Sequence, residues 1–195
     1  GEIFNYRELR QELVARGHRF RTQSDTETLV HLYEEHGLDM LPKLRGMFAF
    51  ALLDRRNDTL YLVRDRFGIK PLYYWRRNGS LSFASEIRPL LAAGYHVEVN
   101  RASVHQYFRT RFAFGDETIF KGVFRLPAGI CLEWKRGDLT LHRYYPEAGA
   151  PAQASATPAT QEQFDAAFAD AVRAWMIADV PVGAYLSGGV DSSAV

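Results

Sequence analysis

The stretch from Met47 to Ser85, MFAFALLDRRNDTLYLVRDRFGIKPLYYWRRNGSLSFAS, decides the fold of the chain. It contains four short runs of aromatic, branched and other apolar residues, at 47–54, 59–65, 71–76 and 80–85. Turn-forming residues separate these runs. Asn78-Gly79 is the most specific turn signal, because a two-residue hairpin turn needs positive φ at both central positions. The pattern predicts an antiparallel meander of four strands.

Helix signals lie on both sides of this stretch. Asn5, with Glu8 three residues later, is a candidate cap for a first helix that Gly17 would end. Ser24 to Glu27 is a second capping box before a second helix. The same criteria predict two later helices, at Glu86 to Ala93 and at Arg101 to Phe112 behind Asn100. They also predict a last hairpin, in which Leu126 to Trp134 and Leu139 to Tyr145 are joined across Arg136-Gly137-Asp138. These elements together predict an α+β domain over residues 1–145.

The composition changes after residue 145. Residues 146–160 are rich in Ala, Pro and Ser and show no hydrophobic period, which is typical of a surface linker. Apolar residues from Phe164 to Trp175 then recur at helical spacing, and Val180 to Leu186 is an apolar run suited to a buried parallel strand. Residues 161–195 are therefore expected to begin a second domain, of the α/β class.

The segment Ser187-Gly188-Gly189-Val190-Asp191-Ser192-Ser193 follows the expected strand and precedes an expected helix. In that context main-chain N–H groups can bind an anion, and glycines let phosphate oxygens approach the backbone closely. The segment lacks the Gly-Lys-Ser/Thr ending of a Walker A loop, so it belongs to a different class of phosphate loop. The alternative is a solvated Ser/Gly turn. A strand before the loop and a helix after it favour phosphate binding.

The composition argues against several classes of function. The chain has 24 Lys and Arg against 23 Asp and Glu, with no basic block that would favour nucleic acid. Its longest apolar stretch, Met47 to Leu53, is far shorter than the roughly 20 residues of a membrane helix. A soluble, cytoplasmic protein is expected. The single cysteine, Cys131, is expected to be a buried structural thiol, and the six histidines show no metal-ligand spacing.

The loop from Ser187 to Ser193, with Val180 to Leu186 before it, resembles the pyrophosphate loop of ATP pyrophosphatases and most closely that of asparagine synthetases. Those enzymes activate a carboxylate as an adenylate. The resemblance implies that Leu186 contacts the adenine nucleotide and that Asp191 binds Mg²⁺. It also implies that the phosphates of ATP are bound directly by Ser187, Gly188, Gly189, Ser192 and Ser193. Asp191 would bind them through its metal ion.

The amino-terminal half resembles class II glutamine amidotransferases, which have an N-terminal-nucleophile αββα fold. The matching blocks are Gly1 to Arg10, Ser24 to Glu27, Arg45 to Phe50, Arg64 to Tyr74 and Phe83 to Ile87. In this family an N-terminal cysteine attacks the glutamine amide and its own α-amino group is the base.

That cysteine and an oxyanion-binding asparagine would lie before Gly1. No catalytic side chain is therefore assigned, and the chain alone is expected to be inactive. The resemblance implies that the Gly1 N–H stabilises the oxyanion, and that Glu2 and Asp25 bind the charged α-amino end of glutamine.

The order of the two resemblances implies a glutamine-hydrolysing asparagine synthetase. Its substrates would be glutamine, aspartate and ATP, and its products asparagine, AMP and pyrophosphate. An amidotransferase or lactam-forming synthetase with another carboxylate acceptor stays open, as does a non-catalytic ligand-binding fragment. Amidophosphoribosyltransferases share the glutaminase segment, but the loop from Ser187 to Ser193 argues against them. The sequence leaves a homo-oligomer open and assigns no role to residues 97–121.

Overall fold

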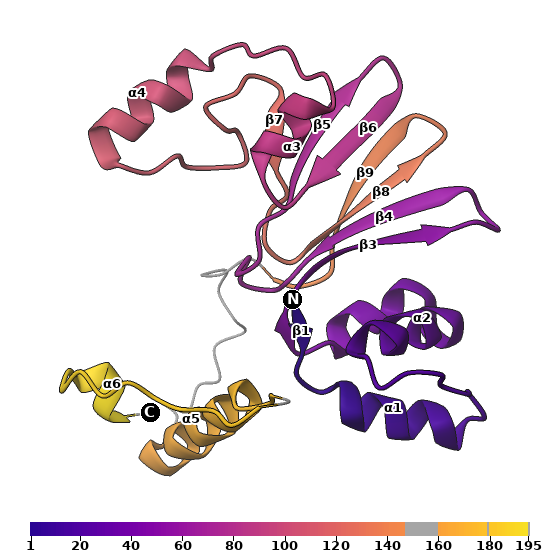
Figure 1. Ribbon diagram of the computed structural model, residues 1–195, viewed down its shortest axis with the longest axis vertical. Coiled ribbons are helices and arrows are strands. Elements are labelled where there is room, and N and C mark those ends of the chain that lie inside the picture. Colours follow the sequence, from indigo (N-terminus) through magenta and orange to yellow (C-terminus); the bar gives the residue numbers. More distant parts are fainter. Residues whose placement is uncertain (147–159, 179, 195) are drawn as a thin grey trace.

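The computed structural model describes residues 1–146, 160–178 and 180–194. Up to residue 146, the chain forms four layers (Figure 1). Helices α1 (Tyr6–Ala15) and α2 (Asp25–His36) cover one antiparallel sheet, a second antiparallel sheet packs on its other face, and α3 (Ile87–Ala92) covers the second sheet. This arrangement confirms the predicted αββα organisation with antiparallel sheets.

The first sheet has the strand order β3-β4-β8-β9, with the bounds Ala49–Asp54, Thr59–Arg64, Ile130–Lys135 and Asp138–Arg143. Successive residues of a strand point to opposite faces. Tyr61, Val63 and Cys131 therefore pack against leucines of α1 and α2. Leu62 and Leu132 lie on the opposite face, in the core between the two sheets. In β4 and β8 both faces are buried, which explains why Leu60 to Val63 and Ile130 to Leu132 are continuously apolar.

The second sheet has the order β6-β5-β7, with the bounds Ser80–Ala84, Tyr73–Arg77 and Val123–Arg125. Tyr74 faces the first sheet, whereas its neighbours Tyr73 and Trp75 pack in the cluster formed with Leu90 of α3. Helix α4 (Arg101–Thr110) extends beyond this sheet (Figure 1). Residues 97–121, to which the sequence assigns no role, therefore include α4 and lie at the periphery of the domain.

A two-stranded sheet fixes the amino terminus. Strand β1 (Glu2–Ile3) pairs antiparallel with β2 (Gly46–Met47), so that Glu2 lies opposite Met47 and Ile3 opposite Gly46. The 3-10 helix η1 (Gly37–Lys43) connects α2 to this sheet. Ile3 is buried in the core with α1 and α2, so β1 holds residues 1 and 2 in a defined position.

The predicted four-stranded meander is wrong, because β4 and β5 belong to different sheets. The hairpins β3-β4 and β5-β6 both form as predicted. Asn78 and Gly79, in the second hairpin, have φ values of 50° and 73°, which confirms the predicted turn. The chain leaves the first sheet after Arg64 and folds into a tight loop before the second sheet begins.

Asp65 organises that loop from inside. Its side chain is fully buried, and its carboxylate accepts hydrogen bonds from four main-chain N–H groups. Oδ1 accepts from Phe67 and Ile69 at 3.0 and 2.9 Å, and Oδ2 accepts from Phe48 and Lys70 at 3.3 and 3.0 Å. The carboxylate therefore substitutes for the strand partners that the loop residues lack.

Arg64 ties the same loop to the residues before β8. Its guanidinium donates to the main-chain carbonyls of Lys70, Leu126 and Gly68 at 2.7, 2.6 and 2.6 Å. Burial lowers the pKa of Arg64 from its usual value, although an arginine stays charged in a protein. The bond from Arg64 to Leu126 joins residues that are distant in sequence. The alternating apolar pattern alone therefore could not reveal that β4 and β5 belong to different sheets.

The predicted helix caps are confirmed only in part. Asn100 accepts a hydrogen bond from the Ser103 N–H and caps α4 as predicted. Ser24 caps α2, but Glu27 does not close the predicted box, since its carboxylate accepts main-chain N–H groups of Arg21 and Thr22. Asn5 does not cap α1, because its side chain bonds to the main chain of Lys43 and Arg45.

The carboxyl-terminal part begins with α5 (Gln161–Trp175), the predicted amphipathic helix, which Thr160 and Gln163 start with a capping box. The predicted strand from Val180 to Leu186 is wrong, since these residues form no strand and are exposed. A parallel strand needs neighbouring strands, and no described residue pairs with this segment. The helix expected after it is present as α6 (Val190–Ala194). Most of the predicted linker lies outside the described residues.

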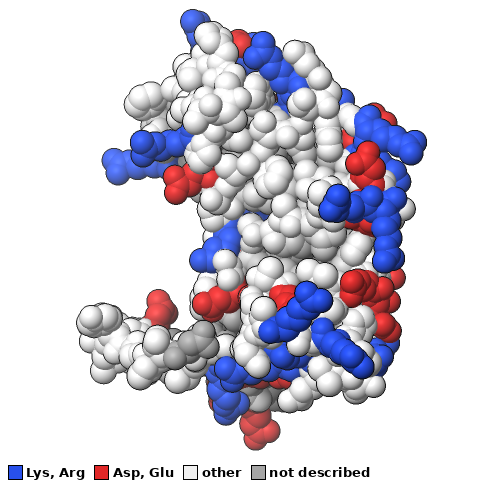
Figure 2. All heavy atoms as spheres, turned by 45° about the vertical axis from the view of Figure 1, so that its right-hand side comes forward, with Lys and Arg blue, Asp and Glu red and all other residues white. Residues whose placement is uncertain are grey.

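The surface carries charges of both signs. On the face in Figure 2, Lys and Arg side chains are interspersed with Asp and Glu rather than gathered in one patch. No helix within the described ranges is long and apolar enough to cross a membrane.

Candidate functional site

A cavity of about 1390 Å³ lies beside the amino terminus. Residues of β1, α1 and the segment before α2 line it, together with residues 177, 178 and 180. Gly1, Glu2 and Asp25, to which the family resemblance gives glutamine contacts, all line this cavity. The structure therefore brings these three predicted residues together.

Asp25 is held in place at the first position of α2. Its Oδ2 accepts the main-chain N–H of Ile3 at 3.0 Å, and the hydroxyls of Ser24 and Thr26 donate to its Oδ1 at 3.5 and 3.3 Å. These bonds connect α2 to β1 and orient the carboxylate. Glu2 is the exposed neighbour on β1. Two acids in the cavity lining suit a cationic amine, because charge-assisted hydrogen bonds are stronger than neutral ones.

Glycines allow β1 to lie close to β2. A Cβ atom on Gly1 would lie 2.6 Å from the Met47 carbonyl oxygen and 2.7 Å from the Phe48 Cα. A Cβ atom on Gly46 would lie 2.2 Å from the Glu2 carbonyl oxygen. Both are main-chain contacts that a side-chain rotation cannot relieve. The position of the Gly1 N–H therefore depends on the absence of side chains here.

We expect Gly46→Ala to lower the free energy of unfolding by about 2 kcal/mol or more, because overpacking forces backbone shifts. Urea unfolding measures this change. Gly183→Ala is the matched control, because a Cβ at Gly183 meets no atom within 4 Å. The control should change stability by less than about 0.5 kcal/mol. Equal stability of the two variants would contradict the close approach of β1 and β2.

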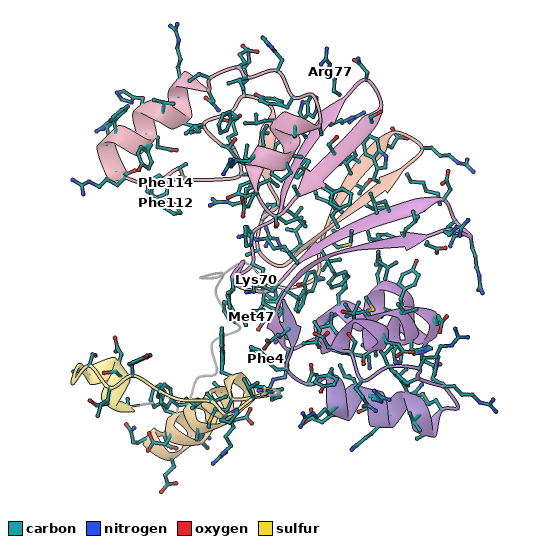
Figure 3. All side chains as sticks on the ribbon, viewed as in Figure 1. Phe4, Met47, Lys70, Arg77, Phe112 and Phe114 are labelled. Carbon is teal, nitrogen blue, oxygen red and sulfur yellow. The ribbon has the colours of Figure 1, made fainter. Side chains whose placement is uncertain are left out.

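Two contacts bring α5 to this end of the domain. The guanidinium of Arg45 lies 2.6 Å from the carboxylate of Asp170, and the hydrogen bond lowers the pKa of Asp170 below its usual value. The rings of Phe4 and Trp175 have centroids 5.0 Å apart, and Figure 3 shows Phe4 between β1 and α5. The ion pair is half exposed and contributes little on its own. The ring contact adds apolar area next to the cavity.

Several residues that line the cavity were not predicted from the sequence. Arg7 and Arg10 lie three residues apart on α1, so their shared face was a signal that could have been used. Ile177 and Ala178 come from a segment far along the chain, and no local pattern connects them to the amino terminus. Residues from the start of the second predicted domain therefore help to form a cavity of the first.

The glycine-rich loop is compact and exposed. The Oγ atoms of Ser187 and Ser192 lie 2.8 Å apart, and Ser192 Oγ also donates to the Gly189 carbonyl at 3.2 Å. Gly188 has a φ of 74°, which favours glycine. Asp191 and Ser193 lie on α6, and Leu186, directly before the loop, is 74% exposed. The predicted nucleotide-binding residues thus form one accessible turn leading into a helix.

Cys131 is confirmed as a buried structural thiol in β8. Its side chain is fully buried, and burial raises its pKa to about 12. The thiolate is the reactive form of cysteine, so this residue lacks the properties of a nucleophile.

We expect iodoacetamide to leave Cys131 unmodified in the native protein at about pH 8, because the thiol is both buried and protonated. Mass spectrometry after alkylation measures the label. The same protein unfolded in guanidinium should be alkylated completely. Rapid labelling without denaturant would show that the thiol is accessible and would contradict its place in the core.

Two histidines that are far apart in sequence lie together in the structure. Nδ1 of His18 and Nδ1 of His31 are 3.2 Å apart, and a carboxylate oxygen of Glu34 lies close to both nitrogens. The spacing of the histidines along the sequence does not reveal this cluster, because thirteen positions separate His18 from His31. It lies apart from the cavity at the amino terminus, since none of the three residues lines that cavity.

Known proteins resemble both parts of the chain. Residues 1–145 match the family described as glutamine amidotransferase domain, and residues 163–195 match the family described as asparagine synthase. Asparagine synthetase (glutamine-hydrolyzing) 1 of Bacillus subtilis is 40% identical over 194 residues, covering 99% of this chain and 30% of the relative. Asparagine synthetase (glutamine-hydrolyzing) 2 of Arabidopsis thaliana is 37% identical over 196 residues, covering 100% and 29%. The chain thus spans less than a third of the length of these two relatives.

Solved structures share the fold. Glutamine phosphoribosylpyrophosphate (PRPP) amidotransferase from B. subtilis, complexed with ADP and GMP, matches with a TM-score of 0.52 and 22% identity over 73% of this chain and 27% of its own. A structure described as the allosteric regulatory enzyme of purine biosynthesis matches with a TM-score of 0.54 and 20% identity over 73% and 26%. Both likenesses confirm the predicted N-terminal-nucleophile amidotransferase fold. Because the first family match covers residues 1–145 of 195, this chain belongs to the glutamine amidotransferase family.

Proposed function

We propose that this chain is part of a glutamine-hydrolysing asparagine synthetase. In the full-length enzyme, ammonia released from glutamine attacks an ATP-activated aspartate and gives asparagine, AMP and pyrophosphate. The observation that carries the proposal is the order of two matches in one chain, a glutamine amidotransferase domain followed by the start of an asparagine synthase domain. Relatives named glutamine-hydrolyzing asparagine synthetase align with nearly the whole chain. We propose domain boundaries at residues 1–145 and 161–195, with a linker between them.

The cavity beside β1 is the proposed glutamine site. Asp25 and Glu2 bind the α-ammonium group of glutamine, and the fixed bond from the Ile3 N–H to Asp25 keeps the carboxylate in position. The Gly1 N–H stabilises the oxyanion that forms when the amide carbonyl is attacked. A glycine suits this role because neighbouring main-chain atoms leave no room for a side chain. The nucleophile itself is proposed to lie outside this chain.

The loop from Ser187 to Ser193 is the proposed ATP site. Its hydroxyls and main-chain N–H groups bind the phosphates, and Leu186 contacts the nucleotide. The exposed carboxylate of Asp191 stands beside these donors, a donor set that fits Mg²⁺. When bound, that ion would neutralise charge on the phosphates of ATP.

The contact between the two parts supports transfer of ammonia within the protein. Ammonia is mostly protonated in neutral water, so a route that excludes water keeps it nucleophilic. Ile177 and Ala178 line the proposed glutamine cavity, and they lie within the segment that matches the synthase domain. The cavity therefore borders both parts. The enzyme is proposed to act in the cytoplasm.

The test is a product assay on the full-length enzyme with glutamine, ATP, Mg²⁺ and a panel of carboxylates. Formation of asparagine, AMP and pyrophosphate with aspartate is the expected result. AMP formation with a different carboxylate and none with aspartate would assign another acceptor. The absence of ATP turnover with every acceptor would reject the synthetase proposal and leave a ligand-binding protein.

A further inference from the structure

Two histidines and a glutamate converge where the loop after α1 meets α2. His18 comes from that loop, whereas His31 and Glu34 lie three residues apart on the same side of α2. Nδ1 of His31 lies 3.2 Å from Nδ1 of His18 and 2.8 Å from Oε2 of Glu34, and His18 Nδ1 lies 3.7 Å from the same oxygen. The three atoms thus lie within 3.7 Å of one another.

These distances match those of a tetrahedral metal site. Bonds of about 2.0–2.1 Å to zinc place neighbouring ligand atoms roughly 3.3 Å apart. We propose that His18, His31 and Glu34 bind a divalent transition-metal ion of the zinc class, with water as the fourth ligand. Two imidazoles and one carboxylate suit zinc better than magnesium or calcium, which prefer ligand sets made only of oxygen.

Further carboxylates lie beside both histidines, hydrogen-bonded to His18 and at ion-pair distance from His31. Nε2 of His18 lies 3.2 Å from Glu35, and Nε2 of His31 lies 3.8 Å from Glu27. Histidines that bind metals through one ring nitrogen commonly donate the other N–H to a carboxylate, which fixes the ring and its tautomer. Here each histidine has its own carboxylate on the side away from the proposed metal.

The supporting carboxylates are themselves held in place. Arg16 donates to Glu35 at 2.7 Å. Glu27 accepts from the main-chain N–H groups of Arg21 and Thr22 at 2.7 Å each, and from the Thr22 hydroxyl at 2.6 Å. The cluster therefore has a preformed frame built from α2 and the loop before it.

Exposure and charge both suit a metal ion. The side chains of His18 and His31 are each 16% exposed, whereas Glu34 is 54% exposed. The imidazoles are thus sheltered, while the glutamate side is open for entry of the ion and for a water ligand. Three glutamates, Glu27, Glu34 and Glu35, lie within 4 Å of a ring nitrogen of the two histidines. The surroundings therefore attract a cation.

Metal binding would move the proton of His31 from Nδ1 to Nε2, and no proton would be released. Without metal, the proton on His31 Nδ1 can be shared between His18 Nδ1 and Glu34. With metal, both Nδ1 atoms coordinate the ion, His31 carries its proton on Nε2 toward Glu27, and the charge of the ion replaces the hydrogen bond. The metal would clamp the loop of residues 18–24 onto α2, directly before Asp25.

The test titrates metal-free, untagged protein of 195 residues with Zn²⁺ in a calorimeter, and with Co²⁺ while visible absorption is recorded. We expect one zinc ion to bind per chain and the cobalt form to show the spectrum of a four-coordinate site. His18→Ala and His31→Ala should each abolish both signals. Glu35→Gln, which changes only the supporting layer, should weaken zinc affinity by about 10- to 100-fold.

His142→Ala is the matched control, because His142 is also paired with a glutamate, Glu133, but lies on β9 away from the cluster. It should bind zinc like the unchanged protein. Glu34→Gln should also lose zinc binding, and it replaces a histidine variant that fails to fold, because the Glu34 side chain is half exposed. The proposal would be overturned if the unchanged protein bound no zinc. It would also be overturned if zinc binding persisted in any folded variant among His18→Ala, His31→Ala and Glu34→Gln. The outcome is independent of asparagine synthesis, because the site shares no residue with the proposed glutamine or ATP sites.

Discussion

Asp65→Ala should lower the free energy of unfolding by about 4 kcal/mol or more, because it leaves four main-chain N–H groups without their acceptor. Each unpaired buried donor costs about 1–3 kcal/mol. The loop held by Asp65 also determines where the chain passes from the first sheet to the second. Since domains of this size are stable by only about 5–15 kcal/mol, the variant is expected to be close to unfolding. Urea or thermal unfolding measures the loss.

Asp65→Asn gives an intermediate case. It keeps one carbonyl oxygen, which can accept two of the four N–H groups, while its NH₂ group opposes the others. We expect it to lose about half as much stability as the alanine variant. Asp138→Ala, at an exposed aspartate in β9, is the control and should change stability by less than about 0.5 kcal/mol. If Asp65→Ala were as stable as Asp138→Ala, the role of this carboxylate in dividing the sheets would be refuted.

Asp25→Asn in the full-length enzyme should raise the KM for glutamine by roughly 10- to 150-fold, which corresponds to the loss of about 1.5–3 kcal/mol from one charge-assisted hydrogen bond. The substitution removes the charge that binds the α-ammonium group. It keeps an amide oxygen that can still accept the Ile3 N–H, so the position of β1 is preserved. Steady-state kinetics with varied glutamine measures the change.

Ammonia in place of glutamine provides the internal control for this prediction. Ammonia-dependent synthesis bypasses the glutamine site, so Asp25→Asn should leave it unchanged. Asp39→Asn, at an exposed position of η1, should leave both activities unchanged. An unchanged KM for glutamine in Asp25→Asn would remove Asp25 from the site. An equal loss of both activities would indicate a structural defect instead.

Local signals predicted most of the elements of this fold but not how the strands are divided. The two-residue period and Asn78-Gly79 gave the correct hairpins, because a turn depends on neighbouring residues. The separation of β4 from β5 depends on the bonds from Asp65 to residues on both sides of it and on those from Arg64 to Leu126. Likewise, the apolar run from Val180 to Leu186 predicted a strand, but no described strand is available to pair with it.

The candidate sites show the same limit. Family resemblance predicted Glu2 and Asp25 as site residues. In the structure, the Ile3 N–H donates to the Asp25 carboxylate, and this bond holds α2 beside the strand that carries Glu2. Ile177 reaches the same cavity from the far end of the chain, and nothing local in the sequence announces it. His18 and His31 meet only because α1 and α2 pack side by side. Sites built from distant segments depend on the tertiary fold, which spacing alone does not reveal.

The most direct test of the proposed function follows the amide nitrogen. The full-length enzyme is supplied with glutamine labelled with ¹⁵N at the side-chain amide, together with aspartate, ATP and Mg²⁺. We predict that the ¹⁵N appears in the side-chain amide of asparagine, with one AMP formed for each asparagine. Release of labelled ammonia without labelled asparagine, or formation of ADP in place of AMP, would contradict the proposed synthetase.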